Sequence, residues 1–244
     1  MKYIIFTDLD DTLFSTRDVG EPATVDKSNE YHSFCSEKKM ALITLLRKSG
    51  ANFIPVTGRC TEALNRCVLP ELINREYSIV SHGMLILDSD DNVIESWLSH
   101  LNSNYDLKLW AKNLSRLKLK LIDDLSDIIN LLDIKLIIDH DIKSHITVKL
   151  KKENYDFHVL KRLSLYFNNK EFDKFLVHEN GRTFSLLPPY CSKSLAVRHL
   201  SKIITDDSDL TISIGDSLTD LDFMINADYV MIPQGTQLSR SLYA

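Results

Sequence analysis

At 244 residues, with 44% hydrophobic and 26% charged residues, the chain has a globular composition that excludes a disordered protein and allows one large domain or two modest ones. Its formal net charge of −5 argues against a nucleic-acid-binding protein, which normally carries a basic surplus. No stretch approaches the ~20 apolar residues of a membrane helix, and acid interrupts the N-terminal apolar run too early for a signal peptide, so we expect a cytoplasmic protein with no membrane partner.

The first part of the chain alternates strands with helices. The predicted elements are, in chain order, a strand at Tyr3–Thr7, a helix at Glu37–Lys48, a strand at Asn52–Val56, a short helix at Thr61–Leu69 and a strand that ends at Gly83. A polar stretch at Ser15–Ser36 shows no clear periodicity. This alternation predicts a parallel α/β sheet.

The middle of the chain, from about Leu85 to Leu187, has a different pattern. The predicted strands lie at Met84–Leu87, Lys135–Asp139, His145–Leu150, Phe175–His178 and Thr183–Leu187. The predicted helices lie at Tyr105–Leu119, Leu125–Leu132 and Asp156–Phe167. Hairpin turns at 139–141 and 179–181 indicate antiparallel pairs. We therefore predict that an α+β domain, residues 87–187, is inserted into a Rossmann-like parallel-sheet core formed by residues 1–86 and 188–244.

The strand and helix pattern of the core then resumes. The predicted elements are a helix at Ser192–Ile204, a strand at Leu210–Ile214, a helix at Thr219–Asn226 and a strand at Tyr229–Ile232. Strands of the core end in Asp8 and Asp10, in Thr57, and in Asp216, with Asp220 one helical turn later. The carboxyl ends of parallel strands share one edge, so these residues should converge there. Clustered carboxylates need a neutralising cation, and Mg²⁺ prefers such oxygen ligands.

Four motifs, in order, resemble those of the haloacid dehalogenase-like phosphatases. DLDDT (8–12) resembles the DxDxT signature, VTGR provides the second-motif Thr57, SKSLAV the third-motif Lys193, and GDSLTD the acidic fourth motif. The position of the insert resembles that of the large α/β cap in the subfamily of trehalose-phosphate, sucrose-phosphate and Cof-type sugar phosphatases. Three residues depart from the usual pattern: Asp11 replaces Gly, His82 replaces Asn in SHG, and Ser217 replaces Asp.

The resemblance implies a role for each motif residue. Asp8 would be the nucleophile, and Asp10 the general acid and base. Phosphate would be bound by Thr57, Gly58 and Lys193. Mg²⁺ would be bound by Asp8, the Asp10 backbone carbonyl and Asp216. Asp220 would support either the ion or Lys193. Together these roles predict a Mg²⁺-dependent phosphatase for a small phosphorylated metabolite, with a sugar phosphate as the favoured class.

Two alternatives remain at this point. Sugar phosphomutases use the same aspartyl-phosphate chemistry and a similar cap. A catalytically idle binding module is disfavoured because Asp8, Asp10 and Lys193 are all present. The group Asp139, His140, Asp141 and His145 is interpreted as a hairpin turn rather than a metal site. The four cysteines lack CxxC spacing and are expected to be free thiols, and no motif specifies the substrate or the oligomeric state.

Overall fold

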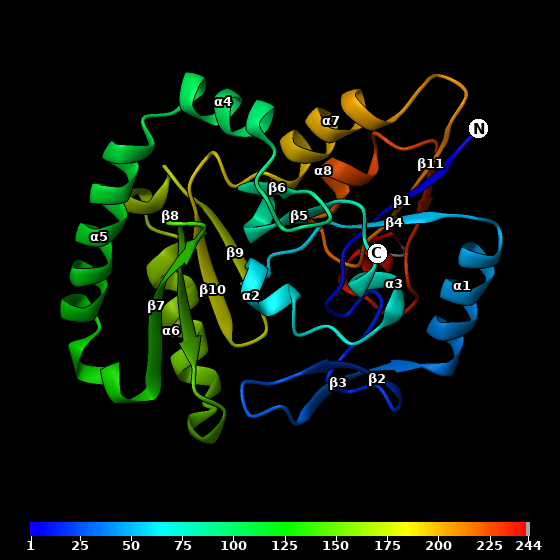
Figure 1. Cartoon of the computed structure of the whole chain (residues 1–244). Coiled ribbons are helices and arrows are strands. Elements are labelled where there is room, and N and C mark those ends of the chain that lie inside the picture. Colours follow the sequence, from blue (N-terminus) through cyan, green and yellow to red (C-terminus); the bar gives the residue numbers. More distant parts are fainter. Residues whose placement is uncertain (243–244) are drawn as a thin grey trace. The chain divides into compact units, whose positions relative to one another are not determined.

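The computed structural model describes residues 1–242, and in it the chain divides into two compact units. Unit 1 comprises Met1–Leu98 and the segment that begins at Ser192, and unit 2 comprises Ser99–Cys191. Unit 1 contains a parallel sheet and unit 2 an antiparallel one, which confirms the predicted α/β fold class (Figure 1). Among the described residues, no helix combines the length and the apolar character that crossing a membrane requires.

The sheet of unit 1 has the strand order β12-β11-β1-β4, and all of its neighbours are parallel. Its strands are β1 (Tyr3–Thr7), β4 (Asn52–Pro55), β11 (Leu210–Ile214) and β12 (Tyr229–Met231). Four of the five residues of β1 are buried, as expected for a strand covered on both faces. The pairing of β1 between β4 and β11 brings the ends of the first, second and fourth motif strands to one edge.

The helices of unit 1 are α1 (Glu37–Lys48), α2 (Thr61–Leu64), α3 (Pro70–Ile73), α7 (Lys193–Ile204), α8 (Leu221–Met224) and α9 (Gln237–Ser241). Of these, α1 and α7 lie within one residue of their predicted bounds, α2 and α8 are shorter than predicted, and α3 and α9 were not predicted. α1 has an acidic first turn and a basic last turn, which suit the helix dipole. Helix α4 (Glu95–Asn104), which the sequence did not predict, crosses from unit 1 into unit 2 at Leu98.

Unit 1 contains a hairpin that the sequence did not predict, and this hairpin shortens one predicted helix. The polar stretch Ser15–Ser36 contains an antiparallel hairpin of β2 (Gly20–Val25) and β3 (Tyr31–Ser36). The predicted helix Thr61–Leu69 stops early because residues 66–68 pair with β2: Val25 N–H donates to the Arg66 carbonyl, and Val68 N–H to the Ala23 carbonyl. Tertiary pairing with this hairpin therefore overrides the helical pattern.

A short paired segment follows α3. Strands β5 (Ser78–Val80) and β6 (Leu85–Leu87) are antiparallel, and the single 3₁₀ turn η1 (Ser81–Gly83) joins them. The Thr57 N–H, just after β4, donates to the Ile79 carbonyl at 2.9 Å. The predicted third strand is thus present, and it places the SHG segment beside the end of β4.

Unit 2 is an α+β unit whose sheet has the order β7-β8-β10-β9, with every pair antiparallel. Its strands are β7 (Leu132–Asp139), β8 (Ile142–Leu150), β9 (Leu176–Asn180) and β10 (Thr183–Leu187). Its helices are α5 (Leu107–Asp124) and α6 (Phe157–Phe167), with 3₁₀ turns η2 (Ser126–Leu131), η3 (Lys152–Asn154) and η4 (Lys170–Phe172). Apolar side chains of both helices and of the sheet form a single buried core.

One helix predicted in unit 2 is not α-helical. The segment predicted as Leu125–Leu132 forms the 3₁₀ turn η2, and Leu132 already belongs to β7. The Leu132 side chain is buried in the core of unit 2, so its burial favours the strand. The 139–141 segment is a tight turn as predicted, with positive φ at His140 and Asp141.

Candidate active site

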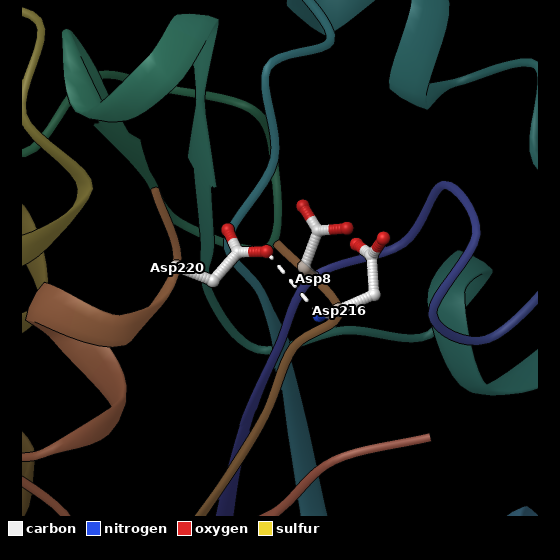
Figure 2. A group of neighbouring side chains, drawn as sticks. All are labelled: Asp8, Asp216 and Asp220. Atoms are coloured by element: carbon white, nitrogen blue, oxygen red, sulfur yellow. Dashed lines mark hydrogen bonds between the residues drawn. The ribbon is translucent and has the colours of Figure 1, made fainter. Parts of the chain in front are cut away.

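Three carboxylates meet at the carboxyl end of the unit 1 sheet. Asp8 directly follows β1 and Asp216 lies just beyond β11, and these strands pair with Thr7 opposite Ile214. Asp220 immediately precedes α8. One oxygen atom from each carboxylate lies within 4.8 Å of the others, and Figure 2 shows the three side chains gathered together. Strand pairing therefore creates the acidic group.

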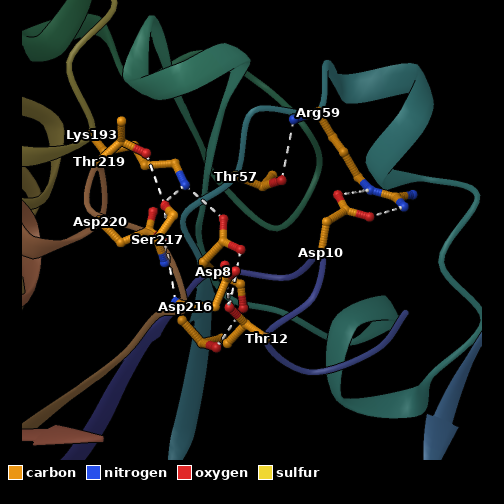
Figure 3. Close-up of polar contacts among 11 residues, drawn as sticks. Asp8, Asp10, Thr12, Thr57, Arg59, Lys193, Asp216, Ser217, Thr219 and Asp220 are labelled. Atoms are coloured by element: carbon orange, nitrogen blue, oxygen red, sulfur yellow. Dashed lines mark hydrogen bonds and ion pairs between the residues drawn. The ribbon is translucent and has the colours of Figure 1, made fainter. Parts of the chain in front are cut away.

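Lys193 supplies positive charge to this group. It is the first residue of α7, whose N-terminus is capped by Ser192 through a hydrogen bond from the Leu195 N–H. The Nζ atom donates to Asp8 Oδ1 at 2.6 Å and to Asp220 Oδ1 at 2.7 Å (Figure 3). Burial lowers the pKa of Lys193, but the carboxylates of Asp220 and Asp8 outweigh this effect and raise it. Lys193 is thus a cation at neutral pH.

The acids of the group exceed this single cation. Burial raises the pKa of Asp8 well above its ordinary value, although Lys193 opposes the rise. Burial, followed by the charge of Asp220, raises the pKa of Asp216 to about 6. The Thr12 hydroxyl lies 3.2 Å from Asp8 Oδ2 and 3.1 Å from Asp216 Oδ1 and bridges the two acids. Three carboxylates facing one ammonium form a site suited to a further cation.

Asp220 is engaged by protein donors on both oxygens. Oδ1 accepts from Lys193, and Oδ2 accepts from the Ser217 hydroxyl at 2.6 Å and the Ser217 N–H at 3.1 Å. Burial alone would raise the pKa of Asp220, but the charge and hydrogen bond of Lys193 outweigh burial and bring the pKa below its ordinary value. The geometry therefore matches an anchor for Lys193 better than a direct metal ligand.

The Asp10 side chain lies outside the acidic group and pairs with Arg59. Arg59 Nη2 donates to Asp10 Oδ1 at 2.6 Å, and Nε donates to Oδ2 at 2.8 Å (Figure 3). The guanidinium also lies over the Phe14 ring, 5.1 Å from its centroid, and the Arg59 side chain is 17% exposed. From the sequence alone, Arg59 could be either a structural residue or a residue at the rim of the site. Its position directly after Thr57–Gly58 was the signal that it lies near the site.

Thr57 and Gly58 form a turn directly after β4. The Thr57 side chain is buried, and its hydroxyl accepts a hydrogen bond from the Arg59 N–H at 3.1 Å. The ring of His82 lies against Gly58, so that a Cβ on Gly58 would lie 2.5 Å from His82 Cε1. The second motif is therefore connected to Asp10 through Arg59 and to the SHG segment through His82.

A family model for haloacid dehalogenase-like hydrolases matches residues 5–232, which is most of the chain. The chain belongs to this haloacid dehalogenase-like hydrolase family. Membership confirms the resemblance inferred from DLDDT, VTGR, SKSLAV and GDSLTD. No curated protein matches the sequence.

Solved structures similar to this haloacid dehalogenase-like hydrolase include three with sugar phosphatase names. A trehalose-6-phosphate phosphatase related protein has a TM-score of 0.54 and 18% identity, over 96% of this chain and 88% of that chain. The sucrose-phosphatase of Synechocystis sp., in complex with sucrose and phosphate, has a TM-score of 0.54 and 14% identity, over 100% and 96%. The C-terminal domain of C. albicans trehalose-6-phosphate phosphatase has a TM-score of 0.54 and 16% identity, over 91% and 72%. At these low identities the TM-scores establish a shared fold alone, which agrees with the predicted parallel-sheet core and additional antiparallel sheet.

The remaining candidate residues of this haloacid dehalogenase-like hydrolase are structural in character. All four cysteines are free, as predicted, and Cys35, Cys67 and Cys191 are buried. Burial raises the pKa of Cys191 to about 12, so its thiol is unreactive. His145 is buried in β8, and burial lowers its pKa to about 3. These residues stay outside the proposed chemistry.

Proposed function

We propose that this haloacid dehalogenase-like hydrolase is a Mg²⁺-dependent phosphatase that releases inorganic phosphate from a small phosphorylated metabolite. The observation that carries the proposal is the position of Asp8. Its carboxylate is buried at the end of β1, in contact with Lys193 and Thr12 and beside Asp216. One edge of the sheet thus carries a candidate nucleophile in Asp8, a cation for the phosphoryl oxygens in Lys193, and carboxylates that could bind a metal ion.

The donor set supports a hard divalent cation. Burial, followed by the charges of neighbouring acids, raises the pKa values of Asp8 and Asp216, so a cation that favours their ionised forms would be bound well. Carboxylate oxygens are the ligands that Mg²⁺ prefers. Asp8 and Asp216 would hold the ion, together with the Asp10 backbone carbonyl, while Asp220 anchors Lys193. Bound there, Mg²⁺ would neutralise the acids and polarise the phosphoryl group.

The reaction proposed for these residues has two displacements. In the first, an Asp8 oxygen attacks phosphorus, the bond between phosphorus and the ester oxygen breaks, and the leaving alkoxide takes a proton from Asp10. In the second, water attacks phosphorus and Asp10 accepts its proton. The bond between phosphorus and the Asp8 oxygen breaks, which releases inorganic phosphate and restores the Asp8 carboxylate. Lys193 and the turn of Thr57 and Gly58 would hold the phosphoryl oxygens through both steps.

Asp10 has to change partner for this role. Both of its oxygens accept hydrogen bonds from Arg59, so the carboxylate is turned toward the guanidinium and away from the acidic group (Figure 3). The Asp10 side chain is 47% exposed and therefore has room to rotate. We expect substrate binding to draw Asp10 from Arg59 toward the leaving group.

The favoured substrate class is a sugar phosphate. Support comes from the folds of the sucrose-phosphatase and the trehalose-6-phosphate phosphatase related protein, which cover almost the whole chain. The inserted segment, predicted as residues 87–187 and present as the compact unit Ser99–Cys191, would serve as the cap that selects the leaving group.

The test compares Asp8→Asn with Asp11→Asn. Asp8→Asn should abolish phosphate release from hexose phosphates in the presence of Mg²⁺, because an amide is not a nucleophile. Asp11→Asn should retain activity, since Asn tolerates the positive φ of this position and Asp11 pairs only with the exposed Arg17 among the contacts found.

Acid quenching should trap labelled phosphate on Asp8 of the wild type. Label on Ser, Thr or His would overturn the mechanism. Phosphorus NMR distinguishes the phosphomutase alternative. Conversion of a hexose 1-phosphate into the 6-phosphate without release of free phosphate would establish that alternative.

A further inference from the structure

We propose that His82 is a positioning residue for phosphate binding: its imidazole packs on Gly58 and holds the turn Thr57–Arg59 in its binding shape. The inference rests on the proposed function, because it assigns this turn to the substrate phosphate. It concerns the residue at which this chain departs from the SNG pattern, and it gives that departure a physical role.

Two backbone hydrogen bonds fix the SHG segment along the turn. The His82 N–H donates to the Thr57 carbonyl at 3.0 Å, and the Ser81 N–H donates to the Arg59 carbonyl at 2.7 Å. Ser81 has a φ of 51° and His82 a φ of 57°, both in the left-handed region that is uncommon for residues with a Cβ. Such conformations persist where the surroundings enforce them, and they concentrate at functional sites.

The His82 ring then occupies the space that a side chain at position 58 would need. A Cβ built on Gly58 would lie 2.5 Å from Cε1 and 2.6 Å from Nε2 of His82. Gly58 has no positive φ, so its backbone conformation alone does not require glycine. The requirement comes from the ring, and glycine and imidazole form a complementary pair.

The same segment also contacts the residue before Lys193. Gly83 has a φ of +89°, and a Cβ there would lie 2.3 Å from the Ser192 carbonyl oxygen and 2.6 Å from the Lys193 nitrogen. Residues 81–83 are therefore packed between two groups expected to bind phosphate: the turn after β4 and the start of α7. The His82 ring contacts the turn, whereas Gly83 contacts the start of α7, so the loss of the ring should disturb the turn alone.

A purely structural role for His82 is the competing interpretation, and the two make different predictions. If the ring only fills space, His82→Ala should lower the melting temperature and leave phosphate affinity unchanged. If the ring positions the turn, KM and the inhibition constant of inorganic phosphate should rise together, by about tenfold, which is the lower end of the effect measured when supporting residues of metal sites are lost. The kcat should change much less, because Asp8 and Lys193 remain in place.

The experiment measures inorganic phosphate inhibition, and KM and kcat with p-nitrophenyl phosphate, for the wild type, His82→Ala and the control His32→Ala. His32 is exposed on β3, so its replacement should leave all three constants unchanged. Equal constants in His82→Ala and the wild type would overturn the proposal.

A double-mutant cycle tests the pairing of ring and glycine directly. Gly58→Ala should weaken phosphate binding strongly in the wild type and much less in the His82→Ala background, because the added methyl then has room. Melting temperatures should show the same lack of additivity without any need for catalysis. Equal effects of Gly58→Ala in both backgrounds would refute the inference alone, whereas a wild type that neither binds nor releases phosphate would refute the proposed function.

Discussion

Replacing Lys193 with Met removes the only ammonium found within hydrogen-bond distance of Asp8 and Asp220 among the described contacts. Met preserves the length and most of the volume of the side chain, so the change is mainly one of charge. We expect unit 1 to lose stability at neutral pH, since the acids of the site would then face one another without compensation.

The magnitude follows from the burial of the group. The side chains of Lys193, Asp8 and Asp220 are 12%, 9% and 1% exposed. Removing one partner of a buried ion pair costs about 3–5 kcal/mol, and we expect about 3 kcal/mol because Asp8, with its raised pKa, can take up a proton. The loss should therefore shrink as the pH falls.

The free energy of unfolding is best followed by Trp97 fluorescence during urea denaturation. The chain has two tryptophans, and Trp97 is buried in unit 1, so a Trp110→Phe background isolates the signal of this unit. Lys39→Met is the matched control, because Lys39 contacts Asp18 at 2.7 Å with both side chains about one-fifth exposed. A pair of this exposure should contribute at most about 1 kcal/mol.

Adding Asp220→Asn to Lys193→Met should recover part of the lost stability, because it removes one of the uncompensated charges. A loss for Lys193→Met no larger than that for Lys39→Met, with no recovery in the double variant, would refute the electrostatic reasoning for the site.

Two further predictions concern pH. The pKa of Asp216 is about 6, the pKa of Asp8 is also raised, and metal ligands must be ionised. The apparent Kd for Mg²⁺, measured by calorimetry, should therefore rise at least tenfold per pH unit below about pH 6. A Kd that does not change with pH would contradict both residues as ligands. Burial lowers the pKa of His145 to about 3, so unit 2 should lose about 2 kcal/mol of stability between about pH 7 and about pH 5, when the unfolded His takes up a proton. His145→Gln should remove this pH dependence of the urea midpoint, and its persistence would exclude His145 as the cause.

Much of the core was predictable because its signals are local. Helix α1 and strand β11 have the predicted bounds, since each combines a clear periodicity with polar residues at its ends. The edge that gathers Asp8 and Asp216 was also predictable, because parallel strands fix where their carboxyl ends lie. These features require no knowledge of side-chain conformation.

The rest depends on contacts between distant residues. The early end of α2 is set by pairing with β2, which lies about 40 residues earlier and has no strong periodicity of its own. The pairing of Asp10 with Arg59 depends on two side-chain rotamers, and the position of the His82 ring depends on a left-handed backbone. A sequence pattern records residue type and spacing, so it leaves such choices open.

The way the chain returns to unit 1 limits how this protein can be re-engineered. Ser192 is the first residue of the returning segment, it caps α7, and its carbonyl packs against Gly83 one position before Lys193. At the other junction, the unit boundary at Leu98 lies inside α4, where Trp97 donates a hydrogen bond to the Met84 carbonyl. If the insert is replaced by that of another protein, the junctions should therefore lie after Asn104 and before Cys191. The whole of α4 and Ser192, which caps the N-terminus of α7, then remain part of the core.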